Sequence, residues 1–389
     1  MTITIVIPWY GPDTAGGAEA QARALAGALA AQGAAVEVWT TDGRDSYAPP
    51  VAYYPAGAGE LDGILVRRFP IEPPHTTIHI PPAIRRTAAD TPWSVFPEHE
   101  LRLLASLPSS DALLDAVLAE RSTRRYIFLP YPFPTTFWGM QLAGDRGVLL
   151  PCLHDEPYAR YSTYRALFAQ AHTILANSAG ERAFALQLYD LGPARVVLAG
   201  EGIDLSPVGD GARFRAARGL HGPLLYCSGV RAGKNAELLI RYTREYWARR
   251  GRPLTLLLSG REVPPIPAAL APLVQDLGYL SVQEKHDAYA AVDLFINPST
   301  IESFSIVLME AWLQGTPALV NAACDVTRTA AVESGGGVSF ASFGEFCAAL
   351  DLLLPDAPLR RELGARGRQW VRANCRWDNV AARTIAAIG

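Results

Sequence analysis

Two glutamates, Glu302 and Glu310, stand eight residues apart in an otherwise apolar segment with a helical pattern, PSTIESFSIVLMEAWLQGTP (residues 298–317). This helix would follow a predicted strand, DLFINPS, with Ser303 or Ser305 as the expected N-cap. A helix that begins at the carboxyl end of a parallel strand binds anions through its unpaired N–H groups. Glu302 would lie beside such an anion, whereas Glu310 lies inside the helix and needs a partner if it is buried.

A ribose is one partner that would suit Glu310, because one carboxylate can accept hydrogen bonds from two hydroxyl groups. The alternative is that Glu302 and Glu310 are two solvated charges on the surface of a helix. Composition and periodicity do not decide between these two interpretations.

Positive charge for an anion is offered by the segment VRAGKN, which places Arg231 and Lys234 after another predicted strand. Lysine is rare in this chain, because Lys234 and Lys285 are the only two and the other basic residues are arginines. Lys234 is therefore a candidate phosphate ligand. The alternative for Arg231 and Lys234 is a solvent-facing basic turn.

A second glycine-rich segment, GGAE, contains Gly16 and Gly17 before a predicted helix. Adjacent glycines allow the backbone to approach a phosphate or a sugar closely. A dinucleotide-binding oxidoreductase is the competing interpretation, since Asp42 follows the second predicted strand where a ribose-binding acid would lie. However, GPDTAGG lacks the GxGxxG spacing and contains Pro12, which disfavours that interpretation.

Three polar residues, His154, Asp155 and Glu156, follow the predicted strand GVLLPCL. His154 is a candidate site residue, and the alternative is that it caps the next helix. Asp155 and Glu156 are candidates for orienting His154 or for binding hydroxyl groups, and the sequence does not rank them.

Metal ligands are not predicted. His75 and His79 in HTTIH have the spacing of a metal pair on a helix, but the flanking prolines argue against a helix there. The five cysteines are scattered without a CxxC pair, which indicates reduced thiols and no zinc cluster. The segment SGGG (residues 334–337) would bring backbone near a nucleotide or simply form a turn.

Composition predicts a globular chain of two domains, because 389 residues exceed the size of one ordinary core. Apolar residues make up 49% and the mean hydropathy is +0.09. The net charge of −3 and the pI of about 6.2 give no basic field that would indicate nucleic acid. The longest apolar runs have the length of strands, and no secretory signal is expected.

Predicted strands and helices alternate along the chain, which indicates an α/β fold with doubly wound parallel sheets. Strands are predicted at TITIVIPWY, AAVEVWTT, GILVRRF, RRYIFLP, GVLLPCL, TILANS, RVVLAG, PLLYCSG, PLTLLLSG, DLFINPS and PALVNA, with helices between most of them. The polar, glycine-rich stretch 201–222 is the expected domain boundary. Residues 70–108 are proline-rich and predict a long irregular insertion that shapes a substrate wall, with Trp93 and Phe96 as candidate wall residues.

The segment PSTIESFSIVLMEAWLQGTPALV closely resembles the donor site of GT-B glycosyltransferases, in particular glycosyltransferase family 4, with its E-x7-E pattern. The resemblance continues along most of the chain through GPDTAGGAE, HDEPYARY, ILANSAGERA, GEGIDLSP, SGVRAGKNAELLI and LGYLSVQEKHDAYAAVDLFINPS. It implies two facing Rossmann-like domains, residues 1–203 on the acceptor side and residues 204–374 on the donor side. The terminal segment 375–389 would form a helix that crosses back onto the first domain.

The resemblance also implies roles for individual residues. Glu302 would contact the donor sugar and Glu310 the ribose. The diphosphate would be bound by the amides of the segment Phe304, Ser305, Ile306 and Val307, with Gly229 close to it, and by Lys234. His154 would lie near the donor sugar and the acceptor, and the Gly16–Gly17 loop would cover the phosphates. In the family, arginine commonly follows the strand glycine directly, whereas here Val230 intervenes before Arg231.

The implied activity is a retaining, metal-independent transfer of a sugar from a nucleotide-diphosphate sugar to an acceptor hydroxyl. No DxD motif is present to hold a metal at the diphosphate, so the charge must come from side chains and helix ends. The alternatives are a sugar-nucleotide epimerase or hydrolase of the same architecture and a non-catalytic sugar-nucleotide-binding homologue. No cofactor is expected, and the acceptor and the oligomeric state are not indicated by the sequence.

The arginine-, alanine- and glycine-rich composition is typical of a bacterial genome of high GC content. The expected location is the cytoplasm, and many relatives act at the inner face of the membrane. The sequence contains no basic amphipathic helix strong enough to assert membrane contact.

Overall fold

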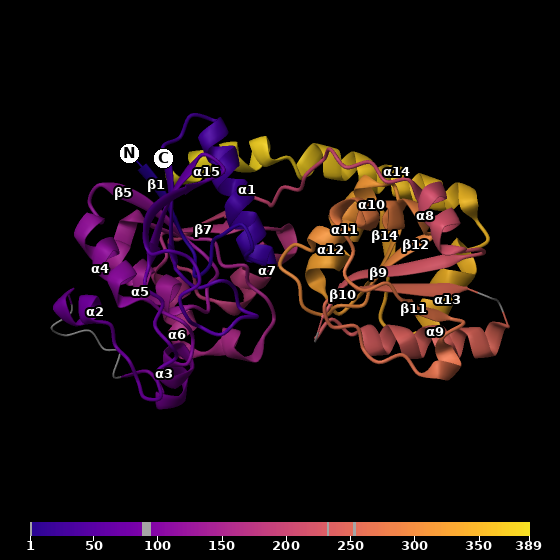
Figure 1. Cartoon of the computed structure of the whole chain (residues 1–389), viewed down its shortest axis with the longest axis horizontal. Helices are drawn as coiled ribbons and strands as arrows, with labels where there is room; N and C mark the ends of the chain where they lie inside the picture. Colours follow the sequence, from indigo (N-terminus) through magenta and orange to yellow (C-terminus); the bar gives the residue numbers. More distant parts are fainter. Residues whose placement is uncertain (1, 88–94, 232, 252–253) are drawn as a thin grey trace. The chain divides into compact units, whose positions relative to one another are not determined.

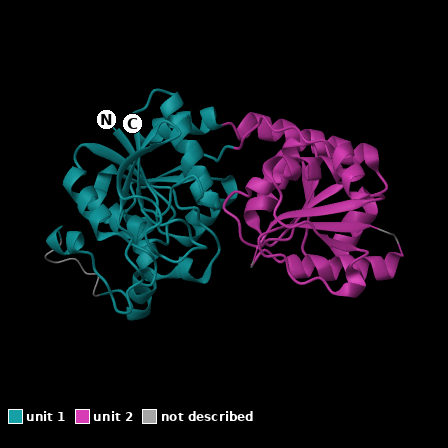
Figure 2. Ribbon diagram, viewed as in Figure 1, with its two compact units in different colours: residues 1–202, 377–389 teal, residues 203–376 magenta. Residues whose placement is uncertain are grey.

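The computed structural model describes residues 2–87, 95–231, 233–251 and 254–389. The chain divides into two compact units, which Figure 2 shows in different colours. Unit 1 comprises Met1–Gly202 and Trp377–Gly389, and unit 2 comprises Ile203–Arg376. Each unit is an α/β domain around a mostly parallel sheet, so the predicted fold class is confirmed.

The sheet of unit 1 has the strand order β3-β4-β2-β1-β5-β6-β7-β8 within the described residues. Its strands are β1 (Thr2–Val6), β2 (Val36–Thr41), β3 (Gly57–Leu61), β4 (Ile64–Phe69), β5 (Arg124–Phe128), β6 (Gly147–Leu149), β7 (Thr173–Ala176) and β8 (Arg195–Leu198). All neighbouring strands are parallel except β3, which pairs antiparallel with β4. The sequence did not predict β3, because GAGEL is glycine-rich and mostly exposed at the edge of the sheet.

Helices cover both faces of this sheet. On one face lie α1 (Gly17–Ala31) and α15 (Trp377–Ile388), which run side by side (Figure 1). On the other face lie α2 (Pro82–Thr87), α3 (Glu98–Ala105), α4 (Asp111–Glu120), α5 (Pro134–Ala143), α6 (Ser162–Gln170) and α7 (Ala179–Leu188). Strand β5 shows the alternation that separates the two cores, since Tyr126 and Phe128 enter one and Ile127 enters the other. The terminal helix thus belongs to unit 1.

Unit 2 has a sheet with the strand order β11-β10-β9-β12-β13-β14, all parallel, within the described residues. Its strands are β9 (Leu224–Val230), β10 (Thr255–Gly260), β11 (Val274–Asp276), β12 (Leu294–Asn297), β13 (Ala318–Asn321) and β14 (Gly337–Phe340). One face packs against α8 (Gly211–Arg218), α10 (Val282–Ala291), α11 (Ile306–Leu313), α12 (Asp325–Ser334) and α14 (Ala357–Asn374). The other face packs against α9 (Ala236–Arg250) and α13 (Phe343–Leu353).

The insertion at residues 70–108 is more regular than predicted, because it contains the short helices α2 and α3. Phe96 packs edge-on against Phe137 with ring centroids 6.4 Å apart, so it contributes to the interior of unit 1. Trp93 lies outside the described residues. The prediction of a non-helical HTTIH segment is confirmed, since α2 begins only at Pro82.

The SGGG segment forms a packing turn between α12 and β14. The indole N–H of Trp312 donates to the carbonyl of Gly336 at 2.9 Å, and a Cβ on Gly336 would meet that indole at 2.8 Å. The backbone of this segment therefore contacts a core side chain of unit 2.

The contact between α14 and α11 depends on small residues. A Cβ on Gly364 would overlap the backbone carbonyl of Gly315, which cannot move as a flexible side chain can. We expect Gly364→Ala to lower the free energy of unfolding by at least about 2 kcal/mol, measured by chemical denaturation. Gly344→Ala in α13 is the matched control, because its Cβ would find only Ser342 Oγ, at 3.8 Å. If both variants unfold like the parent, the close approach of α14 is contradicted.

Candidate functional site

The predicted donor residues lie at the point where the strand order of unit 2 reverses. From β9 the chain proceeds outward through β10 and β11 and then returns to the other side of β9 as β12. Ligands of doubly wound folds bind outside the carboxyl ends of the two strands that flank such a switch point. Lys234 follows β9 and Glu302 follows β12, so the topology brings these two candidates to the same edge.

Lys234 and Glu302 form an ion pair there. Lys234 Nζ lies 2.6 Å from Glu302 Oε1 and also donates to the carbonyl of Ile301 at 3.3 Å. The side chains are 19% and 10% exposed, respectively. The amide of Asn297, the last residue of β12, lies 3.5 Å from the same glutamate oxygen. Glu302 is thus held from β12 and from the start of α9.

Glu310 is buried and has partners of its own. Its Oε1 lies 2.6 Å from Lys285 Nζ, and its Oε2 accepts from the hydroxyl of Tyr289 at 3.1 Å. Lys285 and Tyr289 stand four residues apart on α10 and therefore face the same side of that helix. The Tyr289 hydroxyl is also 2.5 Å from Ser228 Oγ at the end of β9.

The two lysines of the chain are therefore each paired with one of the two glutamates. This excludes the interpretation of Glu302 and Glu310 as solvated surface charges. The sequence did not predict Lys285 as a site residue, although it is the second of the two lysines in the chain. No strand end or glycine-rich turn marks its position. Burial also raises the pKa of the Tyr289 hydroxyl far above its ordinary value, with a further contribution from the Glu310 charge.

The start of α11 differs in detail from the prediction. Ser305 is the residue before the helix, but its side chain does not cap it and instead accepts from Asn297 Nδ2 at 2.9 Å. Ser305 has a φ of 76°, an uncommon value for a non-glycine residue, and its carbonyl accepts the N–H groups of Leu308 and Met309. The first N–H groups of α11, those of Ile306 and Val307, have no acceptor within the helix.

Phe304 and Gly229 complete this edge. The Phe304 side chain is buried in the core of unit 2, so only its backbone is available to a ligand. Gly229 has a φ of 68°, and a Cβ there would meet Val307 Cγ1 at 3.2 Å. The end of β9 therefore lies close to the start of α11. Arg231 is exposed, and its carbonyl accepts the N–H of Lys234 at 3.2 Å.

His154, Asp155 and Glu156 follow β6 in unit 1. His154 Nδ1 lies 3.2 Å from Glu156 Oε1, and the Tyr131 hydroxyl donates to Glu156 Oε2 at 3.1 Å. Burial alone would raise the pKa of Glu156, but His154 and the tyrosine hydroxyls outweigh it and hold this pKa below the usual value. Asp155 instead pairs with exposed Arg160 at 2.6 Å. Glu156, rather than Asp155, therefore orients His154.

Glu181 anchors the loops beside His154 and was not predicted. Its carboxylate accepts the backbone N–H groups of Leu153, after β6, and of Asn177, after β7. Burial raises the pKa of Glu181 to about 8, against the opposing effect of these N–H groups. The sequence signal was the S-x-x-E pattern from Ser178, which accepts the Glu181 N–H at the start of α7.

The glycine-rich segment leads into α1 as predicted. Gly16 is the N-cap with a φ of 145°, and a Cβ there would collide with the Glu19 carboxylate. Beside Gly17, in contrast, a Cβ would find no atom within 4 Å among the described residues. Asp42 accepts the N–H of Ile71 at 2.8 Å and is buried, so its carboxylate has a structural use in unit 1.

The five cysteines are reduced, as predicted, and all are buried: Cys152, Cys227, Cys324, Cys347 and Cys375. No helix within the described part of the chain is long and apolar enough to cross a membrane.

Comparison with known proteins supports the resemblance. Residues 222–356 match the family model described as glycosyl transferases group 1. A relative from Kineococcus radiotolerans, named D-inositol 3-phosphate glycosyltransferase, is 31% identical over 264 residues. This alignment covers 59% of the present chain and 60% of the relative's own length.

Solved structures with the same fold include a sucrose-phosphate synthase from Thermosynechococcus elongatus, with a TM-score of 0.70 and 18% identity over 99% of this chain and 97% of that one. Anabaena HepE in complex with UDP has a TM-score of 0.68 and 14% identity, covering 99% of both chains. The chain has the GT-B fold and resembles glycosyltransferases of family 4.

Proposed function

We propose that this chain is a glycosyltransferase that transfers a sugar from a nucleotide-diphosphate sugar to an acceptor hydroxyl, with retention at the anomeric carbon and without a metal at the diphosphate. The observation that carries the proposal is the arrangement at the switch point of unit 2. Two lysine–glutamate ion pairs, each with its nitrogen and oxygen 2.6 Å apart, lie before and within α11. The first N–H groups of this helix have no acceptor within it and favour an anion.

Charge balance explains how this edge would receive a diphosphate. Lys234 neutralises Glu302 in the present structure, so Glu302 does not repel an incoming phosphate as a bare carboxylate would. The N–H groups of Ile306 and Val307 would donate to the diphosphate, and Arg231 would add positive charge. Once a sugar hydroxyl donates to Glu302, Lys234 is available to the leaving phosphate.

The proposed reaction forms a bond between the acceptor oxygen and the anomeric carbon and breaks the bond from that carbon to the phosphate oxygen. The acceptor attacks on the face that the diphosphate leaves, and a phosphate oxygen takes the acceptor proton. Lys234 would stabilise the negative charge that develops on the leaving nucleoside diphosphate. This scheme requires no protein base, and His154 with Glu156 would position the acceptor or the donor sugar.

A thermal-shift series with UDP, GDP, ADP and TDP tests donor binding. HepE was solved with UDP, so we expect UDP to raise the melting temperature most. A ligand whose free concentration is 100 times its Kd stabilises the folded state by about 2.7 kcal/mol. The same series with EDTA should give the same ranking. If none of the four nucleotides shifts the melting temperature, the donor proposal fails.

Product analysis separates transfer from the alternatives. Incubation of UDP-glucose with the protein should release little UDP until an acceptor is added, and D-inositol 3-phosphate is the first acceptor to test because the relatives carry its name. Release of free sugar or of an isomerised sugar nucleotide from the donor alone would favour the epimerase or hydrolase. Donor binding without turnover across many acceptors would favour a non-catalytic homologue.

A further inference from the structure

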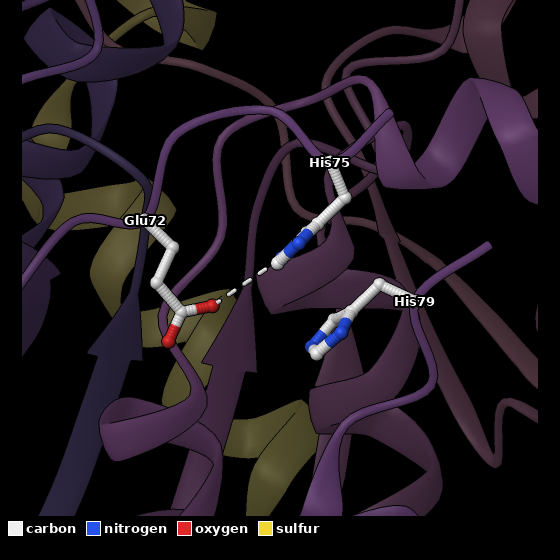
Figure 3. A group of neighbouring side chains, drawn as sticks. All are labelled: Glu72, His75 and His79. Atoms are coloured by element: carbon white, nitrogen blue, oxygen red, sulfur yellow. Dashed lines mark ion pairs between the residues drawn. The ribbon is translucent and has the colours of Figure 1, made fainter. Parts of the chain in front are cut away.

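Three side chains of unit 1 outside the proposed donor site converge in the segment before α2: Glu72, His75 and His79 (Figure 3). One potential ligand atom from each lies within 4.8 Å of those from the other two. Glu72 Oε2 and His75 Nε2 form an ion pair at 3.6 Å, which is longer than a hydrogen bond. Both atoms are buried and have no hydrogen-bond partner within the described residues.

Backbone contacts to residues 105–111 fix the first two of these residues. Glu72 pairs with Ser109 in an isolated antiparallel bridge, with its N–H 2.8 Å from the Ser109 carbonyl. The N–H of His75 donates to the carbonyl of Ala105 at 2.7 Å. The loop between α3 and α4 thus holds Glu72 and His75 in position before any ligand binds.

Asp111, the first residue of α4, contacts both Glu72 and His79. Its N–H donates to Glu72 Oε1 at 3.0 Å, which leaves Glu72 Oε2 directed toward His75. Its carboxylate oxygens lie 3.0 and 3.1 Å from His79 Nε2. The imidazoles of His75 and His79 are stacked with centroids 3.9 Å apart and planes 13° from parallel, so the two rings lie against each other.

We propose that Glu72, His75 and His79 bind a divalent transition-metal ion of the zinc class. Two imidazoles and one carboxylate form a donor set that zinc commonly takes, with a further position open to water. Zinc–ligand bonds of about 2.0–2.2 Å place neighbouring ligand atoms of a tetrahedron about 3.3–3.5 Å apart. The 3.6 Å separation of Glu72 Oε2 and His75 Nε2 is close to that value. The nearby His79 ring would have to turn out of its stack with His75 so that one of its nitrogens also points at the ion.

Two buried polar atoms of the cluster lack a hydrogen-bond partner among the described residues, and a bound ion would contact both. It would supply the missing partner for Glu72 Oε2 and His75 Nε2, whose burial without one is costly. Asp111 acts as a positioning residue, because carboxylates that contact a metal-binding imidazole orient the ring and raise its basicity. The result would be a cross-link within residues 72–79, whose Glu72 and His79 are already hydrogen-bonded to Asp111 at the start of α4.

This inference is independent of the proposed transfer reaction, because the cluster lies in unit 1 and supplies no group to the diphosphate. A zinc ion here would take no part in the transfer, so transfer without a metal at the diphosphate would remain as proposed above. The proposed site is not the helical pair of metal ligands that the spacing of His75 and His79 would suggest, since the chain is not helical there.

Titration of the full-length, EDTA-stripped and dialysed protein with ZnCl2 tests the site. We expect one zinc ion per chain by calorimetry and by elemental analysis after gel filtration, with a higher melting temperature. In the His75→Ala/His79→Ala variant this binding should be lost, and Glu72→Gln should weaken it. Asp111→Asn should lower the affinity about 10- to 100-fold. Co²⁺ in place of Zn²⁺ should give the absorption of a tetrahedral site only when both histidines are present.

His172→Ala is the matched control, because His172 is an exposed histidine of the same unit and should leave the stoichiometry and the affinity unchanged. A parent protein that binds no zinc overturns the proposal. So does a double-histidine or Glu72→Gln variant, folded by circular dichroism, that binds zinc as tightly as the parent. If the double variant does not fold, Glu72→Gln and Asp111→Asn still decide the outcome.

Discussion

Lys234→Ala is expected to lower kcat/KM for sugar transfer by about 100- to 1,000-fold, the effect of removing one preorganised donor from a developing negative charge. The lysine is the cation that Glu302 holds at 2.6 Å where β9 and β12 end. Its loss would remove the stabilisation of the leaving diphosphate and would leave Glu302 without its lysine. The measurement is initial-rate kinetics at saturating acceptor, with the nucleotide product quantified.

Glu302→Gln should also reduce turnover, but for a different reason. The amide keeps the shape of the side chain while it removes the charge that holds Lys234 in place. Arg244→Ala is the matched control, because it removes one exposed positive charge from α9, the helix that follows Lys234, and should leave the kinetics unchanged. Turnover within about threefold of the parent in both Lys234→Ala and Glu302→Gln would contradict the assignment.

The sequence predicted the elements that bury apolar side chains on both faces of a sheet. The sequence predicted β9 and β12 because each begins with an uninterrupted apolar run, LLYC and LFI, as expected for central parallel strands. Strands β11 (VQD) and β14 (GVSF) were not predicted, because they are short edge strands with little apolar pattern. Periodicity therefore located the centre of each sheet better than its edges.

Side-chain partners were harder to predict than the elements that carry them. The periodicity of α11 placed Glu310 inside a helix, but only the tertiary structure shows that Lys285 and Tyr289 of α10 reach it. The prolines that flank His75 and His79 predict that these residues do not lie on a helix, and the structure has no helix there. The stacking of the two rings arises instead from an irregular segment held by residues 105–111, which no local pattern encodes.

The second large effect is expected at the pair formed by Lys285 and Glu310. Lys285→Ala would remove the ion-pair partner of the Glu310 carboxylate, whose side chain is 12% exposed, and leave it the hydrogen bond from the Tyr289 hydroxyl. Breaking a fully buried pair costs about 3–5 kcal/mol, and the 27% exposure of Lys285 reduces this to about 1–3 kcal/mol. The free energy of unfolding, measured by chemical denaturation, is expected to fall by that amount.

The Lys285→Met/Glu310→Gln variant separates structure from binding. With both charges removed, no uncompensated carboxylate remains, so most of the stability lost in Lys285→Ala should return. Nucleotide affinity should stay below that of the parent, because a glutamine amide has one acceptor oxygen and cannot accept a ribose hydroxyl on each of two oxygens as a carboxylate does. A double variant that is stable and still binds UDP like the parent would show that Glu310 serves only the packing of α10 against α11. A stable double variant that has lost UDP binding would place the ribose at Glu310, where Lys285 and Tyr289 stabilise a charge inside an apolar helix.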